Sequence, residues 1–349
     1  MPEPSYAKVL CTTSSANTAI GTSAIALFDI DLGSVVFKNN ISDDIYWNQN
    51  DGTFTFQNDG TYHIVTNLIT ETAAGMRTHT VTFNLNSDSA IYTGAVLTPA
   101  TFDPLSHTHQ RIISVSAGDV LHIKGVASAS TFGINAGSSL IINKITSGVF
   151  ASSTVSTAGT NDTTSEFNPL DTDGDGPAFA TASKIASGIT FTGNAGSMTV
   201  PSAGRYFIMV SNFLGAGGST NSDNTIHIKS GAICFVENLA ASAVLTMTYD
   251  IGSGNCFAGV GTTFTVYKLN DDVSSRQEAL DFTGEMISVV NKASATASGA
   301  EYNGFDEDNY SSADFDTRYS NGITFEDGDG TFTIGKKGTY WIFYTAMIS

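Results

Sequence analysis

The clearest pattern of apolar and polar positions in this chain is a 13-residue segment that occurs three times. It reads GTFTFQNDGTYHI at residues 52–64, GSMTVPSAGRYFI at 196–208 and GTFTIGKKGTYWI at 330–342. On both sides of the second glycine, apolar residues alternate with others, which is the period of a strand with one buried face. Each segment therefore predicts a strand, a tight turn at the second glycine and another strand, that is, a β-hairpin.

The distance between the segments shows how large the repeated unit is. Tyr62, Tyr206 and Tyr340 take the same place in the three segments and lie 144 (206 − 62) and 134 (340 − 206) residues apart. A repeat of this length is a whole domain rather than a short solenoid repeat. We therefore expect three consecutive units, at residues 1–147, 148–270 and 271–349.

The third unit is expected to be incomplete. Ser349 corresponds to Glu71 of the first unit, and the first unit runs on to about Ile145. The apolar strand expected at 340–344 would then need a cover, because an exposed aromatic strand aggregates. We expect this cover to come from a longer chain or from a neighbouring subunit.

The other segments of the first two units also have the pattern of short strands between turns. Val, Ile, Thr, Phe and Tyr dominate THTVTFNLN (78–86), SSLIINKIT (138–146) and TTFTVYKLN (262–270). No segment has the 3.6-residue period of an amphipathic helix. We predict an all-β fold class, with tandem antiparallel jelly-roll β-sandwich domains and an incomplete third copy.

The charge of the chain limits its partners. It has 33 Asp and Glu against 15 Lys and Arg, for a formal net charge of −18. A protein this acidic repels phosphate backbones, so we expect no nucleic-acid partner. We also expect no membrane partner, since no run of 18 apolar residues is present. The first residues lack the basic and apolar regions of a secretory signal, so we expect folding in a cytoplasm.

The three cysteines do not make a disulfide framework. They are Cys11, Cys234 and Cys256. We expect buried free thiols, and the alternative is one disulfide between Cys234 and Cys256 within the second unit.

Two patterns that would indicate an enzyme do not hold. Residues 330–336 read Gly-x-x-x-x-Gly-Lys, as in a phosphate-binding loop, but Lys337 stands where Ser or Thr would hold magnesium. The equivalent segments lack the lysine, and the period is that of a strand. The chain also has no Gly-x-Ser-x-Gly and no His-Glu-x-x-His motif. We expect no catalytic residues and no enzymatic activity.

An acidic stretch in the second unit matches the opening of a calcium loop. Asp171, Asp173 and Asp175 place carboxylates at alternate positions, and Gly176 permits the turn that follows. Ala182 stands where a complete loop has its bidentate acid. The stretch predicts a surface calcium site with further ligands from elsewhere, and the alternative is an acidic solvated loop. A second acidic cluster, at 306–329, leaves the same two alternatives.

His107 and His109 would lie on one face of a strand, where two imidazoles could bind zinc. No cysteine or carboxylate lies nearby at metal-ligand spacing. We therefore expect polar loop histidines rather than a zinc site.

The order of segments in the first unit resembles the jelly-roll fold shared by the tumour necrosis factor family and the globular heads of the first complement component. The resemblance rests on Val35-Val36-Phe37-x-Asn39, on the 52–64 segment, on Ile112 to Ile123 with its Ala117-Gly118-Asp119 turn, and on Ser139 to Ile142. The second unit keeps the repeated segment and the closing strand but lacks the Ala-Gly-Asp turn.

The resemblance implies homotrimers that pack aromatic faces around a threefold axis. The tyrosines of the three segments, Tyr62, Tyr206 and Tyr340, are accordingly the candidate interface residues.

Composition and fold together favour a non-enzymatic virion structural protein of a tailed bacteriophage. It would be a capsid decoration, head-fibre or tail-associated protein, assembled in the host cytoplasm and placed on the particle exterior. Its partners would be capsid or tail proteins and a host-surface glycan. The alternative is a bacterial surface or secreted adhesin with carbohydrate-binding jelly rolls. A polysaccharide-cleaving enzyme would need paired carboxylates in a cleft, and the sequence identifies none.

Overall fold

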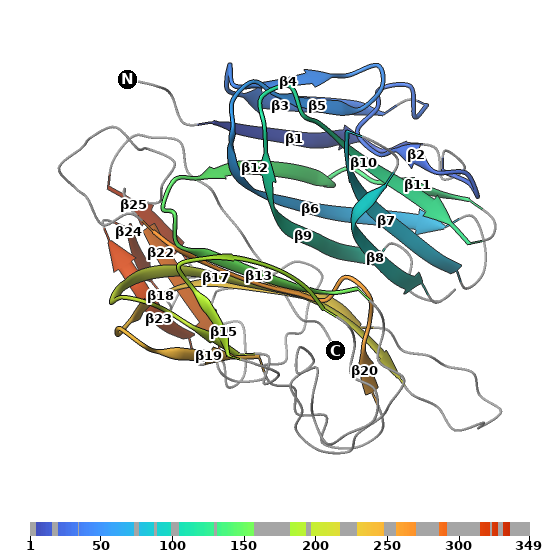
Figure 1. The fold of residues 1–349 in the computed structure, drawn as a ribbon. Coiled ribbons are helices and arrows are strands. Elements are labelled where there is room, and N and C mark those ends of the chain that lie inside the picture. The colour runs from blue at the N-terminus through green and yellow to red at the C-terminus, as the bar shows by residue number, and fades with distance from the viewer. Residues whose placement is uncertain are drawn as a thin grey trace.

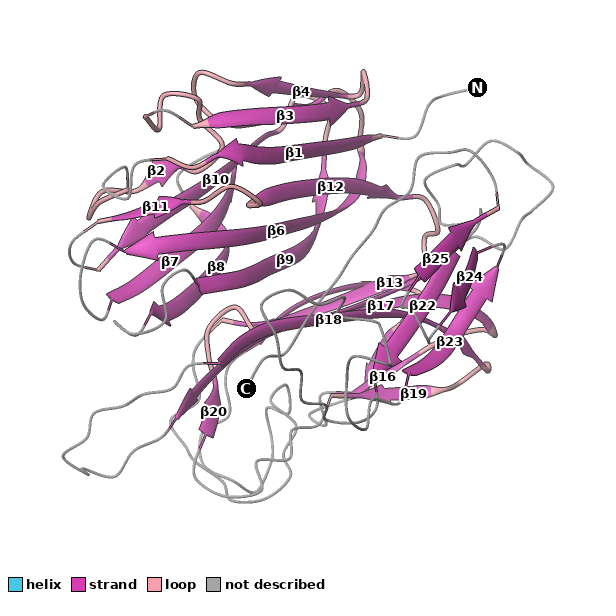
Figure 2. Ribbon diagram, turned by 180° about the vertical axis from the view of Figure 1, so that it is seen from behind, coloured by secondary structure: helices cyan, strands magenta, loops and turns pink. Residues whose placement is uncertain are grey.

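The structure is a computed structural model, and its described part is built from strands. It describes residues 5–15, 20–33, 35–72, 77–86, 89–98, 105–128, 131–156, 182–192, 197–216, 229–247, 256–269, 286–291, 315–321, 323–326 and 331–335. In these ranges there is no helix that could cross a bilayer. The prediction of an all-β fold class is confirmed, and every strand pair is antiparallel (Figures 1 and 2).

The described part of the first unit contains twelve strands. They are β1 (Tyr6–Thr13), β2 (Ile25–Ala26), β3 (Val36–Ile41), β4 (Ile45–Asn48), β5 (Thr53–Phe56), β6 (Gly60–Thr72), β7 (Arg77–Leu85), β8 (Ala90–Thr98), β9 (Leu105–Val115), β10 (Val120–Ala127), β11 (Phe132–Ile134) and β12 (Ser139–Ile145).

These strands form two sheets that pack face to face. In the β6 sheet the order is β9-β6-β12-β1-β3, and β11 also pairs with β6. In the β10 sheet the order is β4-β5-β10-β7-β8, and β2 also pairs with β10. The chain passes repeatedly from one sheet to the other, which is the connectivity of a jelly roll. The two sheets lie one in front of the other in the upper half of Figure 1.

The core of this sandwich comes from the inward-facing residues of both sheets. Tyr62 and Ile64 of the β6 sheet and Phe54 and Phe56 of the β10 sheet are fully buried in one cluster. Trp47 stacks on Phe54 with 6.0 Å between ring centroids and 3° between planes. Large rings of this kind contribute much of the apolar area that stabilises a sandwich.

In the second unit, the residues that the structure describes form nine strands. They are β13 (Phe150–Val155), β14 (Ala182–Ser187), β15 (Thr190–Thr192), β16 (Ser197–Thr199), β17 (Gly204–Ala216), β18 (Lys229–Leu239), β19 (Val244–Thr246), β20 (Cys256–Ala258) and β21 (Thr263–Lys268).

The second unit repeats the first with a smaller second sheet. β17 pairs with β18 on one edge and with β21 and β20 on the other. β13 lies beside β21, with a hydrogen bond of 2.8 Å from Val155 N to Thr262 O, and β14 pairs with β13. This is the β17 sheet. Opposite it, β15, β16 and β19 form the β16 sheet.

The chain length explains why the β16 sheet is smaller. In the first unit, residues 73–104 join β6 to β9 and contain the nine-residue strands β7 and β8. In the second unit, only residues 217–228 join β17 to β18. A link of this length cannot hold two strands of nine residues, and the described part of the second sandwich has no counterpart of the β7–β8 hairpin.

The repeated segment is not a β-hairpin, which corrects the sequence prediction. β5 pairs with β4 and β10, whereas β6 pairs with β9, β11 and β12. The segment therefore crosses from one sheet to the other, and β16 and β17 do the same in the second unit. Both strands bury their apolar face against the same core, so alternation alone does not reveal that they lie in different sheets.

The described part of the third unit consists of four strands. They are β22 (Met286–Asn291), β23 (Phe315–Asn321), β24 (Ile323–Glu326) and β25 (Thr331–Ile334). β25 pairs with β24, as β5 pairs with β4 and β16 with β15. Residues 331–334 are therefore a strand, as predicted.

Candidate functional site: the joint between the first two units

The first two units pack together through their larger sheets. Residues from the outer face of the β6 sheet meet residues of the β17 sheet in one buried cluster, which we call the joint (Figures 1 and 2). The buried apolar members of the joint are Val65, Ile112, Phe150, Phe207, Met209, Ala232, Val236, Tyr267 and Leu269. The joint is thus a third apolar core, formed between two sandwiches rather than inside one.

Strand alternation decides which residues reach the joint. In β6, Tyr62 and Ile64 point into the sandwich core, so His63 and Val65 point outward. In β17, Tyr206 lies in the core of its own unit and Phe207 lies in the joint. The sequence could have predicted the joint from these outward apolar residues, because they make β6 and β17 apolar on both faces.

The structure places two of the candidate interface residues, Tyr62 and Tyr206, in the cores of their own units. Tyr62 and Tyr206 are fully buried within their own units, and the Tyr206 hydroxyl donates to Ser202 O at 2.8 Å. Side chains enclosed in this way cannot reach another unit or another subunit. Their neighbours His63 and Phe207 make the contact between the first two units, with ring centroids 6.0 Å apart. Tyr340 lies outside the described residues.

The edge of the first unit meets the second unit at two glycines. A β-carbon on Gly261 would lie 2.6 Å from Gly94 Cα and 2.8 Å from Tyr92 Oη. Next to this contact, Ala95 N donates to Val260 O at 3.2 Å. The two backbones can therefore approach this closely only because Gly94 and Gly261 have no side chain.

Buried polar side chains form a hydrogen-bonded chain along this edge. The Tyr92 hydroxyl donates to Gly261 O at 3.2 Å and lies 2.9 Å from His109 Nδ1. His109 Nε2 lies 2.8 Å from His107 Nδ1, and His107 Nε2 lies 3.4 Å from Thr70 Oγ1. Since the tyrosine proton goes to Gly261, each imidazole donates from Nδ1 and accepts at Nε2. When both histidines are neutral and carry their proton on Nδ1, every hydrogen bond of this chain therefore has one donor and one acceptor.

A second polar group ties the sheets together at His63. Its Nε2 lies 2.9 Å from Gln110 Oε1, so the imidazole donates to the amide oxygen. The amide nitrogen of Gln110 donates across the joint to Met209 O at 3.2 Å and to Thr263 O at 3.4 Å. Because these groups are buried, losing either partner would leave an unpaired polar atom, which costs about 1–3 kcal/mol.

Burial keeps the joint histidines neutral. It lowers the pKa of His109 to about 3. It lowers the pKa of His63 to about 4, with the Gln110 hydrogen bond acting in the opposite direction. The pKa of His107 lies well below its ordinary value, first through burial and then through the imidazoles of His109 and His79. A charged ring here would lose its hydration and break the chain of hydrogen bonds.

The expectation of loop histidines was wrong for His107 and His109. Both lie in β9 and are buried, and their ring nitrogens are committed to the hydrogen bonds above. In the described part of the chain, no group of three or more His, Cys, Asp or Glu side chains could hold a metal ion. The predicted calcium ligands Asp171, Asp173 and Asp175 lie outside the described residues.

Cys11 has its predicted state of a buried free thiol, whereas Cys234 is a free thiol that is only half-buried. Burial raises the pKa of both thiols. Cys256 belongs to β20, and its side chain is outside the described set.

The comparisons with known proteins show no family. No protein-family model matches the chain, and no curated protein matches its sequence. Among solved structures, the chain is similar to Eiger TNF from S. frugiperda, with 12% identity over 41% of this chain and 94% of that one, at a TM-score of 0.30. It is also similar to murine APRIL, with 10% identity over 40% of this chain and 99% of that one, at a TM-score of 0.26. At these scores neither likeness bears on what the chain does.

Proposed function

We propose that this chain is a non-enzymatic structural protein on the exterior of a tailed bacteriophage particle, as a capsid decoration, head-fibre or tail-associated protein. The observation that carries the proposal is the joint. It fixes two jelly rolls in one orientation through an apolar core, backbone contact and buried hydrogen bonds. Interfaces with large apolar cores restrict domain motion, and a projecting particle protein needs such rigidity.

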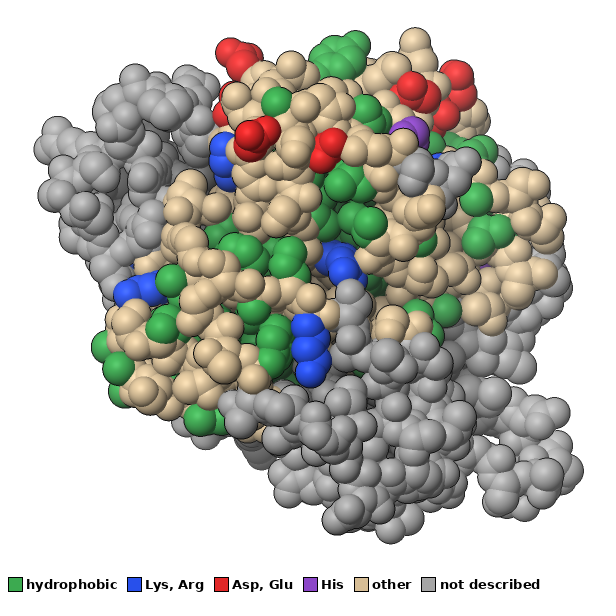
Figure 3. Space-filling model, in the orientation of Figure 1, with side chains coloured by type: hydrophobic (Ala, Val, Ile, Leu, Met, Phe, Trp, Pro, Cys, Tyr) green, Lys and Arg blue, Asp and Glu red, His purple; other side chains and the backbone are tan. Residues whose placement is uncertain are grey.

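Composition supports the same proposal. Charged residues are only 14% of the chain, and acids outnumber bases. On the face that Figure 3 shows, acidic side chains gather at the end of the first unit that lies away from the second. An acidic end of this kind repels nucleic acid and suits contact with protein or carbohydrate.

The proposed assembly is a homotrimer, bound to other capsid or tail proteins. Its contacts would use surfaces outside the joint, because the joint is already buried within one chain. The native mass of the soluble protein tests this part, and three times the chain mass of 36.6 kDa is expected. A stable particle of one chain mass would overturn the trimer.

Particle association tests the location. Purified particles from the source should contain the chain by mass spectrometry, in a copy number that is a multiple of three for each attachment site. Immunogold labelling should place it on the outside. If the chain is absent from particles and present on the bacterial surface, the proposal fails and the adhesin is favoured.

A further inference from the structure

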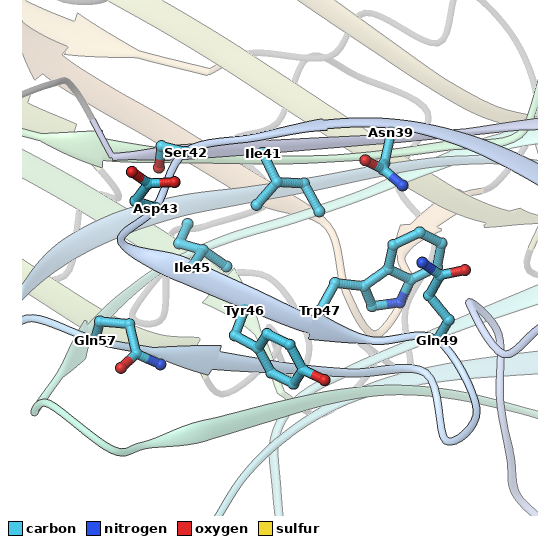
Figure 4. A pocket seen from close by; sticks show the side chains of 9 residues that line it. All are labelled: Asn39, Ile41, Ser42, Asp43, Ile45, Tyr46, Trp47, Gln49 and Gln57. Atoms are coloured by element: carbon cyan, nitrogen blue, oxygen red, sulfur yellow. The ribbon is translucent and has the colours of Figure 1, made fainter.

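The first unit has an open cavity at the edge opposite the joint. β3 ends the β6 sheet, β4 ends the β10 sheet, and a short turn joins these two edge strands. Between them lies a cavity of about 500 Å³. Figure 4 shows its side chains in two rows, with Asn39 and Asp43 in one and Tyr46, Gln49 and Gln57 in the other. Its size is within the range of small-molecule sites.

The floor of this cavity is rigid, whereas its rim is free to bind. Trp47 is buried, stacks on Phe54 and donates from Nε1 to Phe28 O at 3.2 Å. Tyr46, the preceding residue, points the other way and is 61% exposed. An exposed aromatic ring on a strand that the buried Trp47 anchors offers a flat apolar surface to a ligand.

The polar side chains of the rim are not engaged elsewhere. Within the described part of the chain, the side chains of Asn39, Gln49 and Gln57 make no hydrogen bond. Each amide offers two donor hydrogens and one acceptor oxygen, so it can pair with two neighbouring hydroxyl groups. Three such amides around one cavity can accept and donate to several hydroxyls at once.

The charge of the lining narrows the ligand class. Asp43 is the one ionisable acid among the lining residues, and no Lys, Arg or His is among them. A phosphate, sulfate or sialic acid would find no cation here and would be repelled. A carboxylate can instead accept hydrogen bonds from two sugar hydroxyls. The single carboxylate also supplies no acid–base pair for glycoside hydrolysis, which needs two.

We propose that the β3–β4 cavity of the first unit binds a neutral carbohydrate. The sugar ring stacks its C–H face on Tyr46, and its hydroxyls bond to Asn39, Asp43, Gln49 and Gln57. β3 and β4 lie at the edge of the first unit that is away from the second unit (Figures 1 and 2), so the packing of the two units does not cover them. The inference rests on the proposed function only in that an exterior location would bring the cavity to a host-surface glycan.

Binding by the full chain tests the inference directly. The probes are neutral trisaccharides of glucose, galactose, mannose and N-acetylglucosamine, with sialyllactose and a sulfated trisaccharide as acidic probes. Saturation-transfer NMR detects contact, and titration gives the Kd. At least one neutral probe should bind, and Tyr46→Ala should weaken it at least tenfold. Gln49→Ala and Gln57→Ala should each weaken it about five- to tenfold, the loss of one or two hydrogen bonds.

A matched control separates binding in the cavity from nonspecific binding to exposed aromatic residues. Phe332 is also an exposed aromatic residue, at 41%, but lies in β25 of the third unit. Phe332→Ala should leave the Kd unchanged, and an unchanged melting temperature shows that Tyr46→Ala still folds. The inference is overturned if no neutral probe binds, if acidic probes alone bind, or if Tyr46→Ala binds as the parent does. Particle association is measured separately, so either proposal can fail without the other.

Discussion

His63 in β6 and Phe207 in β17 take the same place in two copies of one pattern, and their rings pack against each other across the joint. Val65 and Met209, the next outward residues, also meet in this cluster. Two equivalent sheet faces are therefore buried against each other within one chain, as happens between subunits of a homo-oligomer. The two units differ at the edges of these sheets. β9, an edge strand of the first unit, packs on the β17 sheet. Its counterpart in the second unit, β18, also contacts β22 and β23 of the third unit.

The glycine contact of the joint predicts a steric cost at Gly261. Gly261→Ala would place a methyl group 2.6 Å from Gly94 Cα, at a φ of +96°. We expect an apparent loss of unfolding free energy of about 2–4 kcal/mol, from strain and overpacking together. Urea denaturation measures the loss. Hydrogen exchange of the Ala95 amide, which bonds to Val260 O, should accelerate because the joint opens.

Gly118→Ala is the matched control for this change. Gly118 has a similar φ of +90°, but no atom lies within 4 Å of its added β-carbon. We expect a cost of about 1 kcal/mol there, from backbone strain alone. Equal costs at the two positions would contradict the contact between Gly94 and Gly261.

The joint histidines predict that acid destabilises the protein. In the unfolded chain they take up protons near pH 6.5, whereas in the folded protein the pKa values of His63 and His109 are about 4 and 3. The stabilisation is therefore complete above pH 6.5 and is lost as the pH falls toward 3–4. Between pH 6.5 and 5, each such imidazole should lower the unfolding free energy by up to about 1.4 kcal/mol per pH unit.

The variant His63→Phe tests whether His63 causes part of this pH dependence. Phenylalanine is chosen because it is the residue at the equivalent position of the second unit. It should reduce the slope of unfolding free energy against pH in the same window, whatever its effect at pH 8. A slope identical to that of the parent protein would mean that His63 does not carry this dependence.

The turn before β19 predicts a stabilising substitution. Ser242 has a φ of +64° at the place where the first unit has Gly118. The backbone pairing is also the same, because Ser242 N donates to Val200 O as Gly118 N donates to Phe56 O. Ser242→Gly should stabilise the second unit by about 0.5–1 kcal/mol, since glycine adopts this conformation without strain. Gly118→Ser should have the opposite effect, and a loss of stability in Ser242→Gly would refute the argument.

Calcium binding by Asp171, Asp173 and Asp175 stays a prediction. If the alternating carboxylates hold the ion, calcium should raise the melting temperature and a chelator should lower it, because the ion binds only the folded site. Asp173→Ala should abolish both effects. An unchanged melting temperature in calcium and in chelator would indicate a solvated acidic loop.

The sequence by itself determined the all-β fold class, the repeated unit and many strand positions. These follow from local alternation, because the two-residue period of a strand is written in neighbouring residues. Tyr62, Phe54 and Ile64 are buried where the alternation places them. The sequence analysis missed the turn at Ser242 because the second unit has no Ala-Gly-Asp motif there. The turn is instead held by backbone hydrogen bonds to Val200, which the sequence does not reveal.

Only the tertiary structure decided which strands are partners and which faces meet. β5 and β6 lie in different sheets although only residues 57–59 separate them, and the ring of His109 stacks on that of Phe213, more than a hundred residues away in the chain. The β3–β4 cavity likewise exists because the last strands of two sheets end side by side. Alternation determines that each strand buries one face, but which other strands pack on that face depends on contacts between distant parts of the chain.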